Sequence, residues 1–322
     1  MNINKINYTN IISKLNITIN QIDNDTVIDI DSGDIGPSPQ AIMIKNSFET
    51  AAIWLDQLIH YVPMWRYSDV LPSLFSIMLK GTCHHEVELA KTCHDRCLLT
   101  VQSITSTYTN THENNHVDTS LGLLLLDELV AASNHTSWHV RETVCMCTAA
   151  LLTNNWMTML IAARKRCKEV LNDGLNDIRP EVQLWSRNGM TVYLIIKPLS
   201  ELQTLVEAYV KNSDALAVRE KKRRKANKEG NIIEKPDRVY VTTIMMMSSL
   251  ILSFPYDAPT FIPLLLTSFV KHIQTPALKD TVAQVVQSFK RTHQDRWDEF
   301  KILFTREQLE DLQGTGAQNY FS

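Results

Sequence analysis

Apolar residues recur every three or four positions along most of this 322-residue chain, which is the spacing of a helix with one buried face. Prolines and glycines separate these stretches. Several prolines stand where the next helix begins, a position that needs no backbone N–H donor. From about Lys45 onward the pattern therefore predicts a series of short helices. They cover residues 47–61, 67–80, 85–106, 119–133, 137–153, 155–173, 179–196, 199–225, 237–254, 258–273, 276–291, 293–303 and 305–313.

Five of these helices open alike, with a turn and a polar pair before the apolar stretch. When the openings are aligned, five apolar positions are separated by 53, 42, 57 and 39 residues. HEAT units are roughly 40–47 residues long, and the two longer intervals each contain a loop insertion. The spacing favours an all-α, HEAT-like or armadillo-type α-solenoid of antiparallel helix pairs over an irregular helical bundle. The aligned positions are Val87, Val140, Val182, Val239 and Leu278.

Composition divides the chain into three parts. Residues 1–45 are rich in Asn, Ile and Asp, which predicts a frayed helix followed by a loop. Residues 46–313 form the predicted HEAT-like array, with a basic loop insertion at about residues 219–236. Residues 314–322 form a short, flexible C-terminal tail, because two glycines release it from the last helix.

Composition and charge argue against several fold classes and partners. The chain has only 9 Gly and 11 Pro, whereas all-β folds use both at most turns. Its 44% hydrophobic residues exclude a wholly disordered chain. A net charge of −3 predicts no membrane partner and no direct nucleic-acid binding. We find no secretory signal, and we expect the six cysteines to be reduced thiols in the nucleus and cytoplasm.

A cluster of cysteines and histidines raises the question of a metal site. Cys93 and Cys97 would share one helical face, but the sequence lacks the second ligand pair that zinc sites usually carry. Cysteine is also a small apolar residue that helical cores commonly bury. We therefore interpret the cluster, and Cys145 with Cys147, as core residues, and we expect neither a metal nor a cofactor. The cluster comprises Cys83, His84, His85, Cys93, His94 and Cys97.

Catalytic motifs are missing from the sequence. It contains no G-x-S-x-G, G-x-G-x-x-G, G-x-x-x-x-G-K-[ST] or H-E-x-x-H pattern. Asp127, Glu128 and Asp173 lie in helical stretches without a partner at acid–base spacing. No residue is assigned as catalytic, and we expect a protein that is not an enzyme.

Residues 219–228 hold seven basic residues and one acidic residue. The run is consistent with a solvated helix end, where cations are favourable. It is also consistent with an anion-binding patch or a nuclear import signal, and its density favours the import signal. The candidate import residues are Lys221, Lys222, Arg223, Arg224 and Lys225.

The C-terminal tail reads Gly-Thr-Gly-Ala-Gln-Asn-Tyr-Phe-Ser, with two aromatic residues beside the terminal carboxylate. Capture of a C-terminal carboxylate is a recurring mode of peptide recognition. An unstructured end that happens to carry aromatic residues is an equally good explanation.

Three motifs near the C-terminus are long enough to be specific. They are SFPYDAPT at residues 253–260, SFKRTHQDRW at residues 288–297 and FTREQL at residues 304–309. Together with SWHVRETV at residues 137–144, they resemble the C-terminal end of the large single-chain HEAT-repeat proteasome activators. The resemblance is strong from about residue 137 onward and weaker back to about residue 46.

This resemblance implies a protein that docks on the α-subunits of the 20S proteasome core and promotes gate opening without ATP or ubiquitin. Family members act partly through a C-terminal hydrophobic–tyrosine–any-residue motif. Tyr320 would fill the hydrophobic position and Phe321 the tyrosine position, and the Ser322 carboxylate would pair with a lysine between α-subunits. Phe321 lacks the tyrosine hydroxyl, and a lost hydrogen bond of about 0.5–1.5 kcal/mol should weaken docking or gate opening.

Two departures from the family limit what the resemblance implies. Family members are far longer, so we expect this chain to be a fragment, a truncated gene model or a reduced paralogue. The family is also linked to acetylated histones through an acetyl-lysine site with an Asn-Phe pair. That pair falls near Lys197-Pro198 here, so this partner is not carried over. The alternative function is a generic HEAT-repeat scaffold, which could be nuclear, with an inert tail.

Overall fold

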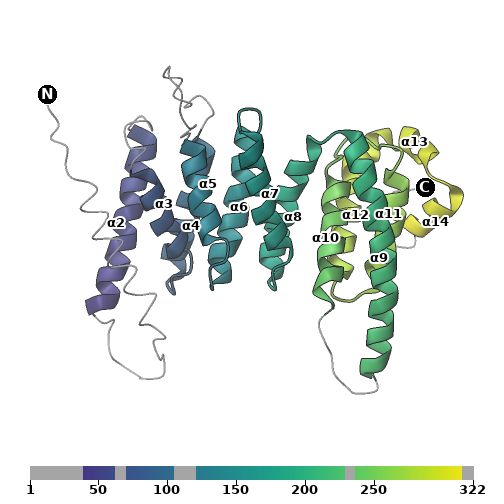
Figure 1. The fold of residues 1–322 in the computed structure, drawn as a ribbon, viewed down its shortest axis with the longest axis horizontal. Coiled ribbons are helices and arrows are strands. Elements are labelled where there is room, and N and C mark those ends of the chain that lie inside the picture. Colours follow the sequence, from purple (N-terminus) through teal and green to yellow (C-terminus); the bar gives the residue numbers. More distant parts are fainter. Residues whose placement is uncertain (1–38, 62–69, 105–120, 229–235, 314–322) are drawn as a thin grey trace. The chain divides into compact units, whose positions relative to one another are not determined.

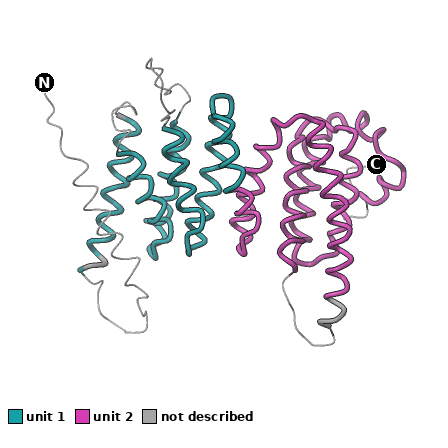
Figure 2. The backbone as a smooth tube through the Cα atoms, in the orientation of Figure 1, with its two compact units in different colours: residues 1–170 teal, residues 171–322 magenta. Residues whose placement is uncertain are grey.

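The computed structural model describes residues 39–61, 70–104, 121–228 and 236–313, and every regular element in them is a helix. The predicted all-α fold class is therefore confirmed. The chain divides into two compact units, residues 1–170 and residues 171–322 (Figure 2). None of the helices in the described residues is both long and apolar enough to span a membrane.

The first unit stacks its helix pairs in two layers (Figure 1). Helices α3 and α4 form one pair, and α5 and α6 form the next. Helix α3 packs on α5 and α4 packs on α6, so equivalent helices of successive pairs lie in the same layer, while α2 packs on α3 and α4. This is the solenoid packing that the repeat spacing predicts. The helices are α2 (Pro39–Tyr61), α3 (Leu71–Gly81), α4 (Val87–Ser103), α5 (Leu121–Ala132) and α6 (Trp138–Asn155), and α7 (Ile161–Leu175) crosses the unit boundary.

The second unit repeats this arrangement. One layer contains α9 and α11, and the other contains α8, α10 and α12. The last helix, α14, packs on α11. The helices are α8 (Pro180–Ile195), α9 (Leu199–Lys228), α10 (Arg238–Leu252), α11 (Ile262–Val270), α12 (Lys279–His293), α13 (Trp297–Phe300) and α14 (Arg306–Gln313). Three short 3-10 turns accompany them, η3 (Lys271–Gln274), η4 (Gln294–Arg296) and η5 (Lys301–Leu303).

A repeated turn precedes the second helix of three pairs. In each turn a side chain accepts a hydrogen bond from the backbone N–H two residues later. The acceptors are Nδ1 of His84 (3.1 Å), Nδ1 of His135 (3.1 Å) and Oδ1 of Asp177 (2.9 Å). Each of these residues also donates its own N–H to the carbonyl three residues earlier, at 3.1 Å. The turn is therefore the structural signature of the repeat.

The observed starts of the helices correct the alignment of the apolar positions. Val140, Val182 and Leu278 are buried as expected, but Val87 is 74% exposed and Val239 is 58% exposed. The alignment is wrong at these two valines because α4 and α10 begin at a different distance from them. In four of the five helices the buried residue is the third of its helix, where the first turn faces the core, whereas Leu278 directly precedes α12. These residues are Leu89, Val140, Val182 and Tyr240.

Most predicted helices are present, but several boundaries differ, and the predicted helix at residues 293–303 is only the short α13 between the 3-10 turns η4 and η5. Helix α2 begins at Pro39, inside the predicted leader, whose first 38 residues lie outside the described part of the chain. Helix α7 begins at Ile161 rather than at residue 155, because α6 continues to Asn155. Helix α9 continues to Lys228, so residues 219–228 are helical where the sequence predicted a basic loop. Lysine and arginine are good helix formers and are favoured near a helix C-terminus.

Gly81 provides a test of the packing in the first unit. A Cβ at this position would lie 2.5 Å from Cys93 Sγ and 3.0 Å from Phe48 Cδ1, so α2 and α4 leave no room for it. We expect Gly81→Ala to lower the free energy of unfolding by about 1–3 kcal/mol. In Gly122→Ala the new Cβ would meet only Leu151, at 3.8 Å, and the change should be neutral or stabilising. Urea unfolding of both variants measures the difference, and equal effects would contradict this packing.

The His84 turn predicts a dependence of stability on pH. A backbone N–H can only donate, so the Nδ1 of His84 must be unprotonated to accept from Glu86. Burial, followed by the neighbouring His85, lowers the pKa of His84. Because the pKa of His84 is lower in the folded than in the unfolded state, its hydrogen bond stabilises the fold above about pH 6.5. This stabilisation is lost as the pH falls below that value. We expect the full chain to lose melting temperature between pH 7.5 and pH 5.5.

The variant that isolates this effect is His84→Asn, because asparagine accepts the same hydrogen bond without titrating in this range. It should lose less melting temperature than the wild type over the same pH interval. His94→Asn is the control, since the His94 ring faces the carboxylate of Asp95 at 3.4 Å rather than a backbone N–H. If His84→Asn and His94→Asn have the same pH profile, the turn is not the origin of the dependence.

Candidate docking surface of the C-terminal unit

The predicted docking residues, Tyr320, Phe321 and Ser322, lie outside the described residues, which end at Gln313. The structure does describe the helix that leads to them. Helix α14 packs on α11, and its Leu312 is only 1% exposed. The segment that follows therefore starts from a fixed point on the second unit.

The connection between α10 and α11 is held in place by His293, at the end of α12. Its Nε2 lies 3.0 Å from the backbone oxygen of Asp257, and its Nδ1 lies 2.8 Å from that of Phe289. The imidazole stacks on the Phe289 ring at 3.9 Å and meets the Phe300 ring edge-on at 5.1 Å. His293 is 1% exposed. Two of the motifs that carry the family resemblance, residues 253–260 and 288–297, are thus joined by one buried side chain.

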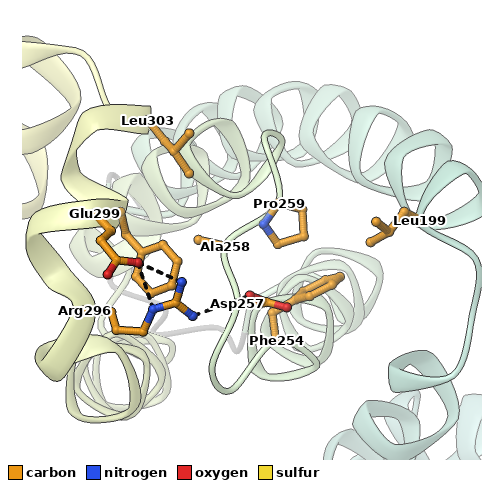
Figure 3. Close-up of a pocket in the computed structure, with 9 residues that line it drawn as sticks. Leu199, Phe254, Asp257, Ala258, Pro259, Arg296, Glu299 and Leu303 are labelled. Carbon is orange, nitrogen blue, oxygen red and sulfur yellow. Dashed lines mark hydrogen bonds and ion pairs between the residues drawn. The ribbon is translucent and has the colours of Figure 1, made fainter.

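A cavity of about 420 Å³ opens beside this connection (Figure 3). Its wall comes from the start of α9, the α10–α11 connection, α13 and η5. Leu199 is 57% exposed and Leu303 is 40% exposed, so the apolar wall continues to the rim. The cavity is suited to an apolar side chain. Its apolar lining residues are Leu199, Phe254, Ala258, Pro259, Phe300 and Leu303.

Arg296 places a charged group at the rim of this cavity. Its Nε and Nη2 atoms lie 2.8 and 2.7 Å from Oε2 of Glu299, and its Nη1 lies 4.0 Å from Oδ1 of Asp257. The guanidinium also lies over the Phe300 ring, 5.1 Å from its centroid. The hydrogen bond from Arg296 to Glu299 raises the pKa of this guanidinium, which stays charged. The rim therefore holds one cation between two carboxylates.

The candidate import residues lie at the C-terminal end of α9. Lys221 and Lys222 are exposed, but Arg223 donates from Nε and Nη2 to the two carboxylate oxygens of Glu220, at 3.0 Å each. Glu220 is only 4% exposed. Arg223 is thus held by a buried carboxylate of its own helix. The side chains of Arg224 and Lys225 lie outside the described residues, and nuclear import stays a prediction.

The cysteines behave as core residues, as interpreted from the sequence, with one exception. Cys93, Cys97, Cys145 and Cys147 are buried, whereas Cys83 is exposed. Burial raises the pKa of Cys93 to about 12, so its thiol stays protonated and is a poor metal ligand at neutral pH. Within the described ranges, no group of three or more histidine, cysteine or acidic side chains could hold a metal ion.

Part of the second unit resembles a known protein family. Residues 238–322 match a family model described as "Proteasome activator complex subunit 4-like, C-terminal". The resemblance to the large proteasome activators is confirmed. The matched segment includes α10 to α14, and it contains every residue that lines the cavity except Leu199.

Curated relatives carry the same description. Proteasome activator complex subunit 4A of Danio rerio is 29% identical over 189 residues, which are 58% of this chain and 10% of that protein. Proteasome activator complex subunit 4 of Homo sapiens is 26% identical over 190 residues, with the same two shares. Proteasome activator subunit 4 of Arabidopsis thaliana is 22% identical over 272 residues, 84% of this chain and 14% of that protein. The chain spans about a tenth of the length of the first of these relatives.

The sequence indicated the segments of this site but not the roles of their residues. His293 and Arg296 both lie in the motif at residues 288–297, and Asp257 lies in the motif at residues 253–260. Nothing in the spacing of these motifs shows that they are in contact. The available signal was that a histidine and an arginine occur three residues apart, at the end of a strongly amphipathic helix.

His293→Ala tests whether this side chain positions the α10–α11 connection. The variant loses a buried ring and its hydrogen bonds, and we expect a cost of about 2–4 kcal/mol in the free energy of unfolding. Amide hydrogen exchange at residues 256–260 should increase, because the Asp257 carbonyl loses its partner. The exposed neighbour Arg291→Ala is the control. Unchanged protection of residues 256–260 in His293→Ala would show that other contacts hold the connection.

Proposed function

We propose that this chain is the proteasome-docking part of an activator that binds the α-ring of the 20S core. The match of residues 238–322 to the C-terminal domain of the family carries this proposal. The chain would bind and regulate, and peptide cleavage would remain with the proteasome. We also propose that it works in both nucleus and cytoplasm.

The C-terminal tail would provide the specific contacts. The nine residues after Gln313 can reach about 30 Å from the end of α14 when extended. The Ser322 carboxylate would pair with a lysine between two α-subunits, and Tyr320 and Phe321 would fill apolar space next to it. The packing of α14 on α11 supports this proposal, because a tail that extends from an immobilised helix loses less entropy on docking.

The tail would promote gate opening, without ATP or ubiquitin, through this mode of binding. A ligand can shift a conformational equilibrium only by the difference between its affinities for the two states. The tail would therefore have to bind the open form of the ring more tightly than the closed form. A generic HEAT scaffold with an inert tail is the alternative, and it predicts no dependence on the last three residues.

Removal of Tyr320–Ser322 tests the proposal. We expect this truncation to reduce co-sedimentation of the full chain with purified 20S particles and to reduce the stimulation of fluorogenic peptide cleavage. C-terminal amidation should act in the same way, since it removes the charge and leaves both aromatic rings. Gln318→Ala, in the same tail, is the control. Equal co-sedimentation of all variants would support the scaffold alternative.

Phe321→Tyr tests the proposed position of this ring in the pocket. The added hydroxyl restores the family motif, and a hydrogen bond of about 0.5–1.5 kcal/mol corresponds to an increase in affinity of roughly twofold to tenfold. Tyr320→Phe, which changes the neighbouring ring by one hydroxyl in the opposite direction, should not produce this gain. A tighter complex in both variants, or in neither, would argue against the assigned positions.

A further inference from the structure

Helix α9 continues for two turns past the point where its partner helix begins. Helix α10 starts at Arg238, and the backbone N–H of Asp237 just before it donates to Oε2 of Glu220 at 3.4 Å. Residues 221–228 therefore extend beyond the packed part of the pair, over about 12 Å of helix. Figure 1 shows the lower end of α9 projecting past α10. We call residues 221–228 the basic overhang.

The root of the basic overhang is fixed to α10. Glu220 is buried, with its two oxygens held by Arg223 and by the Asp237 N–H, and Nη2 of Arg219 lies 3.9 Å from Oδ2 of Asp237. A buried carboxylate needs such partners, because an unpaired one would be strongly destabilising. The charges of Glu220 and Arg223 offset each other, and the overhang continues as a helix from this anchored turn.

The remaining charge of the basic overhang has one sign. Residues 221–228 contain six basic residues and no acidic residue, although the whole chain has a net charge of −3. Lys221 and Lys222 are exposed, and no hydrogen bond or ion pair ties either to a neighbour among the described residues. Helical spacing places positions 221, 225 and 228 along one face of α9. The helix thus concentrates positive charge that the net charge conceals.

We propose that the basic overhang binds the phosphate backbone of double-stranded nucleic acid. Phosphates are regularly spaced negative charges, and lysines that neutralise them release bound counterions, which drives association. A protein partner fits less well, because the centres of protein–protein interfaces are depleted in lysine and Ala226 is the only apolar residue of the overhang. Lysines contact phosphates without reading bases, so this binding is independent of sequence.

The direct test is binding of a fluorescein-labelled DNA duplex of about 20 base pairs to the full chain, followed by fluorescence anisotropy. We expect a Kd of about 10⁻⁴–10⁻⁶ M that weakens steeply between 50 and 200 mM salt. The double substitution Lys221→Glu and Lys222→Glu should weaken binding by at least about tenfold and make the salt dependence shallower by about two phosphate contacts. The corresponding double substitution to Gln should have a smaller effect in the same direction.

Matched controls separate this site from a general effect of charge. Lys211→Glu with Lys279→Glu makes the same change in net charge at two exposed positions of the same unit, and it should leave binding unchanged. Thermal melting confirms that each variant is folded. The proposal is overturned by absent or salt-independent binding, or by equal loss in the control. It is also overturned if polyglutamate competes as well as unlabelled duplex does, because the site would then favour an acidic protein.

Discussion

Each of these helices has an apolar face that it cannot bury alone, so the fold depends on how the two helices of a pair are joined. They are joined by a short turn in which a side chain three residues before the second helix accepts a backbone hydrogen bond. That bond sets where the helix begins, and its starting residue sets which side chains face inward. The third residue of each such helix is consequently buried, namely Leu89 in α4, Val140 in α6 and Val182 in α8. A solenoid has few long-range contacts to correct a wrong helix phase, which makes this local turn decisive.

The C-terminal unit adds a second kind of constraint to the repeated packing. Here the connection between α10 and α11 is long, and a buried histidine from α12 holds it through its backbone rather than through an apolar contact. The Phe289 ring, stacked on the imidazole, and the Phe300 ring, which meets it edge-on, fix the orientation of that histidine. The cavity beside Arg296 adjoins this connection, and all of its lining residues except Leu199 lie in the segment that matches the proteasome activator family model. The site depends on tertiary packing, because its residues come from the two motifs, from α13 and η5, and from the start of α9.

Neighbouring charged residues of α9 are used differently. Along the packed part of the helix, Glu220 is buried and must be paired, which ties Arg223 to the interior of the pair. Lys221 and Lys222, the two residues between Glu220 and Arg223 in the chain, are exposed instead. A run of basic residues that looks uniform in the sequence is thus divided by the structure into an anchored residue and a free surface. A linear import signal and a folded cationic helix make different use of the same residues, and the ion pair of Arg223 favours the folded form.

The sequence alone determined the helical class, the positions of most helices and the stacking of helix pairs, because hydrophobic periodicity and proline placement are local properties. It also revealed the resemblance to the proteasome activators, since the motifs near the C-terminus are specific without any knowledge of contacts. It could not determine the phase of α4 and α10, where valines at the helix start were mistaken for core residues. Nor could it show that His293 contacts the Asp257 carbonyl, or that Glu220 accepts hydrogen bonds from Arg223 and from the backbone N–H just before α10. These contacts join residues that are distant in the chain or depend on which face of a helix is covered, and only the packing of the helices decides them.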